Sequence, residues 1–252
     1  LIWNVGVDDS WQKQISEAVA VAEKAEVVIL TVGIEEGEFR DRAMLSLPGK
    51  QEQLIEAVAA TGKPVIVLLS GGSAVTMNNW MDKVSAIADI WYPGEEGGNA
   101  VADVLLGKYN PSGKLTITFP MHEAQLPLVY NHKPTGRGDD YNNLTGQPLF
   151  PFGYGLSYTT FEYSDLKFSQ KQITADGKLT VTCKIKNTGK YTGDEVVQLY
   201  IRDLLSSVSQ PVIALKGFQK ISLAPGQTKE VTFDITPELL QLLDKNMKWI
   251  VE

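Results

Sequence analysis

The chain has 252 residues, enough for two modest domains, and its 43% hydrophobic and 21% charged residues are ordinary for a folded globular protein. Its formal net charge of −7 argues against nucleic acid and against an anionic membrane surface as partners, because no basic face is available to meet phosphates. No apolar run reaches the roughly 18 residues that would suggest a membrane-spanning helix.

Metal ions and cofactors are not expected either. The chain has a single cysteine, Cys183, and two histidines that stand apart from any cysteine or carboxylate cluster, so no metal site is predicted. A glycine-rich stretch after Trp91 lacks the spacing and the lysine of a phosphate-binding loop, and Glu95 and Glu96 would repel a phosphate. We therefore expect no nucleotide cofactor.

The first half of the chain alternates amphipathic helix patterns with short apolar runs. The helix patterns cover residues 11–24, 51–60, 78–83 and 97–106. The apolar runs cover residues 27–32, 65–70 and 86–92. Strands that alternate with helices at this interval predict a mostly parallel sheet, and the solid run over 27–32 indicates a strand buried on both faces.

A loop of unusual charge follows the first apolar run. It carries four carboxylates and two guanidinium groups within eight residues, namely Glu35, Glu36, Glu38, Arg40, Asp41 and Arg42. One interpretation is a solvated surface loop whose charges pair loosely. The other is a site in which one Glu acts as general acid/base and its pKa is set by its neighbours, because loops at the carboxyl ends of parallel strands commonly carry such sites.

From residue 161 onward the pattern changes to strict alternation of apolar and polar residues, which predicts strands. The clearest runs cover residues 179–186, 195–202, 214–222 and 229–235. Several short antiparallel strands separated by turns predict a β-sandwich. The expected fold class is therefore α/β plus all-β.

Three motifs in this order resemble glycoside hydrolase family 3, the family of β-glucosidases, β-xylosidases and related exo-acting enzymes. The first is E-G-E-F-R-D-R followed by L-S-L-P-G-K-Q, which resembles the family's acid/base loop. The second is Y-P-G-E-E-G-G with N-P-S-G-K-L and F-P after it, and the third is P-F-G-Y-G-L-S-Y. The later N-T-G and G-D-E-V-V-Q-L-Y segments are similar to the fibronectin-III-like domain that ends many family members.

The resemblance implies an α/β-sandwich domain over 1–125, a linker and interdomain junction over 126–160, and a fibronectin-III-like β-sandwich over 161–252. In relatives about two more strands follow the segment matched by Trp249 and Val251, so this sandwich is expected to lack its last strands. The third motif is expected to be structural, with glycines that allow close backbone approach and aromatic residues that join the two domains.

The resemblance also implies a retaining glycosidase, in which one carboxylate attacks the anomeric carbon and a second carboxyl group acts first as acid and then as base. In the family the nucleophile lies on a preceding (β/α) barrel domain, so we expect this chain to supply only the acid/base. The E-x-x-D-R spacing places that role on Glu38, with Glu36 as the alternative. Asp41 and Arg42 are expected to brace the loop.

Candidate substrate-binding residues lie in the segment between the two domains, although the same side chains could simply cover a domain junction. They are Arg137, Tyr130, Asp139 and Asp140. The expected substrates are β-linked oligosaccharides or aryl glycosides, and the expected partner is a barrel domain or chain that carries the nucleophile. The resemblance is compatible with a homodimer and implies a periplasmic or secreted location.

Two details stay open at this point. The Phe39-Arg40 pair, where other members carry Gly, is more similar to the xylosidase and arabinosidase branch than to the strict glucosidases. A non-catalytic carbohydrate-binding or interaction module of the same fold is the alternative function, and a flavodoxin-like domain with a small ligand is a further one. Hydrolysis that requires both Glu38 and a barrel partner would exclude both alternatives.

Overall fold

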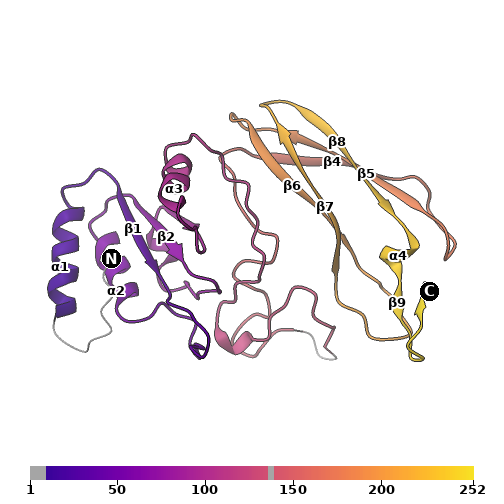
Figure 1. Cartoon of the computed structure of the whole chain (residues 1–252), viewed down its shortest axis with the longest axis horizontal. Helices are drawn as coiled ribbons and strands as arrows, with labels where there is room; N and C mark the ends of the chain where they lie inside the picture. The colour runs from indigo at the N-terminus through magenta and orange to yellow at the C-terminus, as the bar shows by residue number, and fades with distance from the viewer. Residues whose placement is uncertain (1–9, 136–138) are drawn as a thin grey trace. The chain divides into compact units, whose positions relative to one another are not determined.

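The computed structural model describes residues 10–135 and 139–252, which fall into two compact units (Figure 1). The first unit contains the residues up to Ala102 together with Phe119–Pro127. The second contains Asp103–Thr118 together with Leu128–Glu252. The domain boundaries expected from the sequence stay a prediction, and each unit is described by itself below.

The first unit is built on a parallel sheet with the strand order β1-β2-β3. Its strands are β1 (Val28–Gly33), β2 (Val65–Ser70) and β3 (Ala86–Asp89). The helical segments of this part of the chain are α1 (Ser10–Ala22), α2 (Gln51–Ala59), the 3-10 turn η1 (Met81–Lys83), α3 (Gly97–Leu105) and the 3-10 turn η2 (Glu123–Gln125). The predicted α/β architecture with a parallel sheet is confirmed.

The central strand β2 is the best-buried element of this sheet. Val65, Val67 and Leu69 are at most 2% exposed, and Leu68, which points to the opposite face, is 5% exposed. A solid apolar run is typical of a strand that is covered on both faces. The strand predicted from the apolar run over 65–70 is therefore confirmed.

For β1 the interpretation as a strand buried on both faces is wrong. Ile29 is 55% exposed and the preceding Val27 is 50% exposed, so one side of this strand is open to solvent. The physical reason is position, because β1 lies at the end of the strand order and pairs only with β2 among the described residues. Hydrophobicity alone does not distinguish a central strand from an edge strand.

The third strand and the short helix are both shorter than the patterns predicted. β3 ends at Asp89 and not at Tyr92, because Trp91 has a φ of 50°, in the left-handed region that breaks an extended strand. The helix expected over 78–83 is reduced to the 3-10 turn η1. Because β3 ends early, Tyr92 lies in a loop at the carboxyl end of the sheet.

The second unit is antiparallel. One sheet has the order β4-β5-β8, with β4 (Phe161–Phe168), β5 (Leu179–Asn187) and β8 (Thr228–Ile235). A second sheet pairs β6 (Gly193–Ile201) with β7 (Ala214–Leu223), and a short helix α4 (Pro237–Leu240) precedes the β9 (Leu242–Leu243) and β10 (Trp249–Ile250) pair. The buried cluster of Ile185, Val197, Ile221, Leu223 and Val231 draws on both sheets. This shared core confirms the predicted β-sandwich.

The N-T-G motif has a structural explanation in a buried asparagine. Asn187 is 0% exposed, and its Nδ2 donates to the carbonyls of Tyr191 at 2.8 Å and Leu223 at 2.9 Å. Its Oδ1 accepts from the Thr159 hydroxyl at 2.6 Å and from the Gly189 N–H at 3.0 Å. Every polar atom of this side chain therefore has a partner, which is what burial of an amide requires.

The third sequence motif also acts through close packing within the second unit. A Cβ added at Gly155 would lie 2.1 Å from the Gly113 carbonyl oxygen, and one added at Gly153 would lie 2.2 Å from Gln198 Oε1. Gly153 also has a φ of 80°, which favours glycine. The prediction that these glycines allow close backbone approach is confirmed.

We expect the Asn187→Ala variant to lower the free energy of unfolding by roughly 2–4 kcal/mol, because two carbonyls, one N–H and one hydroxyl lose their buried partner. Urea unfolding followed by circular dichroism measures this change. The control is Asn142→Ala, an exposed position where a change within about 0.5 kcal/mol is expected. Equal effects at the two positions would contradict the structural role of Asn187.

Candidate active site

The carboxylate of Glu36 connects the loops that follow all three parallel strands. Its Oε2 accepts hydrogen bonds from the Gly72 backbone N–H at 2.7 Å and from the Tyr92 hydroxyl at 3.1 Å. Its Oε1 accepts from the Ser73 hydroxyl. Gly72 and Ser73 come after β2 and Tyr92 comes after β3, so a side chain from the β1 loop ties the three strand ends together.

Arg42 reinforces the same connection. Its Nη2 donates to Ser73 Oγ at 2.9 Å and to the Ala74 carbonyl at 3.1 Å, and its Nη1 donates to the Ser46 carbonyl at 3.4 Å. Its Nη2 also lies 3.9 Å from Glu36 Oε1. Both charged side chains are mostly covered, with 16% and 24% exposure. Arg42 thus braces the loop through the turn after β2, whereas Asp41 is exposed.

These contacts keep Glu36 ionised. Its partial burial acts to raise the pKa, but the hydrogen bonds from Ser73, Gly72 and Tyr92 and the charge of Arg42 together lower the pKa below its ordinary value. All of these groups favour the carboxylate over the neutral acid. A side chain in this state is suited to hold a loop in place and is poorly suited to donate a proton near neutral pH.

The turn after β2 needs glycine at two positions. A Cβ at Gly72 would lie 2.7 Å from Glu36 Oε2 and 2.9 Å from the Tyr92 ring, and a Cβ at Gly71 would lie 2.3 Å from Ile34. The backbone must come this close for the Gly72 N–H to reach the carboxylate. The Gly71-Gly72 pair is therefore part of the site.

The other end of the charged loop is fixed by the last residue of the L-x-L-P-G-x-Q motif. Gln51 Nε2 donates to the Gly33 carbonyl and Gln51 Oε1 accepts from the Gly33 N–H, both at 2.8 Å. The Leu45 carbonyl accepts from the Thr76 N–H at 2.9 Å, which holds the middle of the segment. The loop is thus attached at its start, its middle and its end.

Between these attachments, the tip of the loop is open. The Arg40 N–H donates to the Gly37 carbonyl at 3.0 Å, which closes a turn with Glu38 and Phe39 at its centre. Glu38 is exposed, and Phe39 is 93% exposed with a φ of 65°. A positive φ at the third position is the feature of a turn that normally carries Gly. Arg40 pairs with Glu35 at 2.6 Å, and the exposed Glu38 lies between these two residues in the sequence.

The candidate substrate residues belong to the second unit, whereas Glu38 belongs to the first. Tyr130 stacks on Phe152 with ring centroids 4.2 Å apart. Asp140 accepts from the Gly146 N–H at 2.7 Å and from the Thr145 hydroxyl at 3.0 Å, and these bonds lower its pKa. Asp139 accepts from the Thr135 hydroxyl at 3.3 Å. Arg137 lies outside the described residues.

The sequence analysis missed the partners of Glu36. Gly72 and Ser73 were given no role, and Tyr92 was interpreted as the last residue of the apolar run over 86–92. The available signal was topological, because residues that follow neighbouring parallel strands come together at one edge of a sheet. A polar or glycine-rich turn after each of three consecutive strands was therefore a sufficient reason to group them.

Comparison with known proteins identifies the family. The description "Glycosyl hydrolase family 3 C-terminal domain" matches residues 5–158, and "Fibronectin type III-like domain" matches residues 195–252. The first match covers more than half of the chain. The fold and the loop are thus those of a glycosidase family, and the chain belongs to glycosyl hydrolase family 3.

Individual relatives agree with this assignment. The chain is 43% identical to a periplasmic β-glucosidase of Salmonella typhimurium, a match that covers 96% of this chain and 33% of that protein. It is 44% identical to a β-xylosidase of Formosa agariphila, a match that covers 97% of this chain and 35% of that protein. A β-glucosidase from Listeria innocua, solved in complex with glucose, superposes with a TM-score of 0.90 at 33% identity. That match covers 98% of this chain and 36% of the other. The chain therefore spans about a third of the length of the curated relatives it matches.

We expect the Glu36→Gln variant to lower the pKa of Tyr92. Burial raises the pKa of this phenol, and the side-chain hydrogen bond and negative charge of Glu36 raise it further, so removal of the charge takes away one of the causes that raise it. A ¹³C NMR titration of the tyrosine rings measures the change, with Tyr92→Phe to assign the resonance. If the pKa of Tyr92 is the same in the unmodified chain and in the Glu36→Gln variant, the Glu36–Tyr92 contact is contradicted.

Asp89, at the end of β3, gives a pH prediction. Burial raises the pKa of this carboxyl from 3.8 to about 6, despite a hydrogen bond from the Trp91 N–H. The folded state therefore binds more protons than the unfolded state between these two values, and the free energy of unfolding falls as the pH rises through this window. We expect Asp89→Asn to stabilise the chain at pH 8 and to have little effect below pH ~3.8, as urea unfolding at the two pH values will show.

Proposed function

We propose that this chain is the acid/base-bearing C-terminal part of a retaining, exo-acting glycosidase of the β-glucosidase or β-xylosidase type. Such an enzyme removes terminal sugars from β-linked oligosaccharides. The observation that carries the proposal is the exposed Glu38 carboxyl on a turn whose surrounding loop is attached to the strand ends through Glu36, Arg42 and Gln51. An acid that must meet a substrate needs both accessibility and a fixed position.

The role assigned to Glu38 is that of a proton carrier. In the first step its protonated carboxyl group donates to the glycosidic oxygen while the bond to the anomeric carbon breaks. In the second step its carboxylate takes a proton from the water that attacks the glycosyl-enzyme intermediate. The nucleophile in this scheme is a carboxylate on a (β/α) barrel domain outside these 252 residues, which is consistent with the threefold greater length of the relatives.

Glu36 is the less suitable acid. Its two oxygens already accept three hydrogen bonds, and its lowered pKa keeps it ionised when the first step needs a proton donor. The charge on Glu36 has a structural use, because it holds the loop that presents Glu38. The two neighbouring carboxyl groups would thus divide the tasks of support and proton transfer.

The remaining parts of the proposal concern substrate, partner and location. Arg137, Tyr130, Asp139 and Asp140 stay candidates for substrate contacts, and a barrel domain is the proposed partner. One relative is named a periplasmic β-glucosidase, which supports a periplasmic or secreted location. Within the described residues, no helix has the length and apolar character needed to cross a membrane.

The test is hydrolysis of aryl β-glucosides and β-xylosides by this chain alone and in the presence of a barrel-bearing chain. We expect turnover only in the combined sample. There, Glu38→Gln should lower kcat for substrates with poor leaving groups by about 10²-fold or more, because such substrates need the proton. A dinitrophenyl glycoside, whose leaving group departs without protonation, should lose much less in the first step.

The matched control is Glu35→Gln, an exposed carboxylate in the same loop that pairs with Arg40. This variant should retain most of the activity. If the chain alone turns over substrate at a Glu38-dependent rate, the nucleophile lies within these residues and the proposed division is wrong. If Glu38→Gln has no effect in an active combined sample, Glu38 is not the acid/base. If Glu36→Gln has no effect there either, the chain acts as the non-catalytic module that the sequence left as the alternative.

A further inference from the structure

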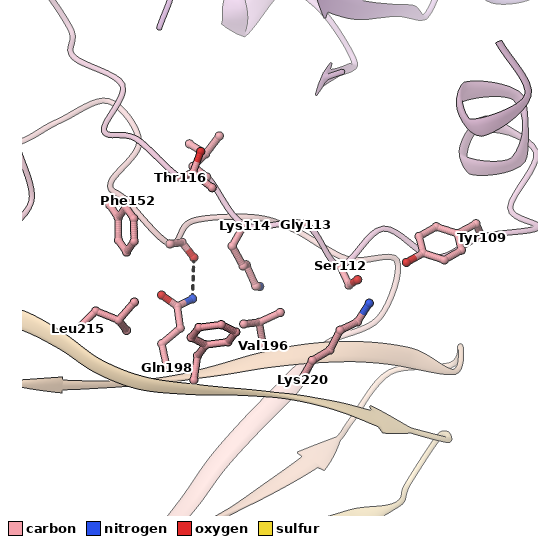
Figure 2. Close-up of a pocket in the computed structure, with 13 residues that line it drawn as sticks. Tyr109, Ser112, Gly113, Lys114, Thr116, Phe152, Val196, Gln198, Leu215 and Lys220 are labelled. Carbon is pink, nitrogen blue, oxygen red and sulfur yellow. Dashed lines mark hydrogen bonds between the residues drawn. The ribbon is translucent and has the colours of Figure 1, made fainter. Parts of the chain in front are cut away.

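A cavity of about 490 Å³ lies within the second unit, on the face of β6 and β7 that points away from the sandwich core (Figure 2). Its walls come from Tyr109, from residues 112–116, and from Phe152 and Gly153. The cavity is broadly open to solvent, and its volume falls within the roughly 300–1,000 Å³ that is typical of small-molecule pockets. Glu38, Tyr130, Asp139 and Asp140 are not among the described residues that line it.

The floor of the cavity follows from the strand register. Gln198 on β6 is opposite Phe218 on β7, and Val196 is opposite Lys220, so these four side chains share one face of the two-stranded sheet. The residues next to them, Val197 and Ile221, belong to the buried core on the other face. Phe218 is nevertheless 66% exposed. A large aromatic surface is thus left available beside a lysine.

The polar groups around this floor form balanced charge pairs. Lys220 Nζ lies 3.0 Å from Asp194 Oδ2, and Tyr109 lines the same cavity. Lys114 Nζ lies 3.2 Å from Glu195 Oε2 and 2.9 Å from the Gly155 carbonyl oxygen. Each ammonium group that lines the cavity is thus paired with a carboxylate just outside the lining, so its positive charge is balanced. This balance favours a neutral polar ligand over an anion.

The glycine-rich motif keeps the cavity in shape. Gln198 Nε2 donates to the Gly153 carbonyl at 3.1 Å, the contact drawn as a dashed line in Figure 2, and its Oε1 accepts from the Tyr200 hydroxyl at 2.5 Å. Phe152 is held by its stacking on Tyr130. The walls are therefore fixed by contacts that do not depend on a ligand, as expected of a pre-formed site.

We propose that this cavity binds the pyranose ring of a neutral sugar, which makes the β-sandwich unit a carbohydrate-binding unit. A pyranose has an apolar face of C–H groups and a rim of hydroxyl groups, and the cavity matches it with the Phe218 ring and the Lys220, Tyr109 and Ser112 polar groups. The choice of xylose and glucose as the sugars to test rests on the proposed function. The geometry of the cavity is independent of the proposed function.

The experiment is a titration of the whole ¹⁵N-labelled chain with methyl β-D-xylopyranoside, methyl β-D-glucopyranoside and cellobiose, followed by amide chemical shifts. We expect saturable shifts at Phe218, Gly113, Gly153 and Lys220. The Phe218→Ala variant should weaken binding by about tenfold or more, which corresponds to about 1.4 kcal/mol. Lys220→Met, which keeps the length of the side chain without the ammonium group, should also weaken it.

The matched control is Phe168→Ala, which removes another exposed aromatic ring. Phe168 lies on β4, outside the cavity, and is 56% exposed, so this variant should leave the affinity unchanged. Absence of saturable shifts, equal affinity in Phe218→Ala, or shifts confined to the charged loop over 35–42 would each overturn the proposal. Binding of glucuronate but of no neutral sugar would overturn it as well. Because this titration needs no hydrolysis, its failure is distinguishable from a failure of the Glu38 assay.

Discussion

The hydrogen-bonded carboxylate of Glu36 is the interaction on which the candidate site depends. It brings together the β1 loop, the Gly72-Ser73 turn after β2 and Tyr92 after β3. Three strand ends that are neighbours in a parallel sheet would otherwise carry independent loops. The glycines of the turn and the left-handed Trp91 that ends β3 are the backbone conditions under which this side chain can reach all its partners.

This arrangement explains how one short loop can use so many charges. Glu36 and Arg42 are largely covered and make several directed contacts, whereas Glu35 and Arg40 form an exposed pair at the tip. The exposed pair contributes little to stability because solvent screens it. The covered charges hold the loop to the strand ends, whereas Glu38 is exposed.

Much of the fold was predictable because periodicity reports local structure directly. The apolar run of β2, the alternation in β5 to β8 and the glycine motif around Gly153 were all interpreted correctly from the sequence. The exposure of Ile29, the early end of β3 and the partners of Glu36 were not, because each depends on which elements are neighbours in space. In the site, the sequence singled out Glu36, Glu38 and Arg42 but not the turn and the phenol that hold them.

The open side of β1 has a consequence for the behaviour of this chain in solution. Val21, Val27 and Ile29 are 70%, 50% and 55% exposed, and they border an apolar groove between α1 and the outer side of the strand. An extended, apolar edge strand is a template for intermolecular β-pairing. We therefore expect concentrated preparations of this chain to associate through this edge, and a charged residue in place of the exposed Ile29 to reduce that association while leaving the loops at the strand ends unchanged.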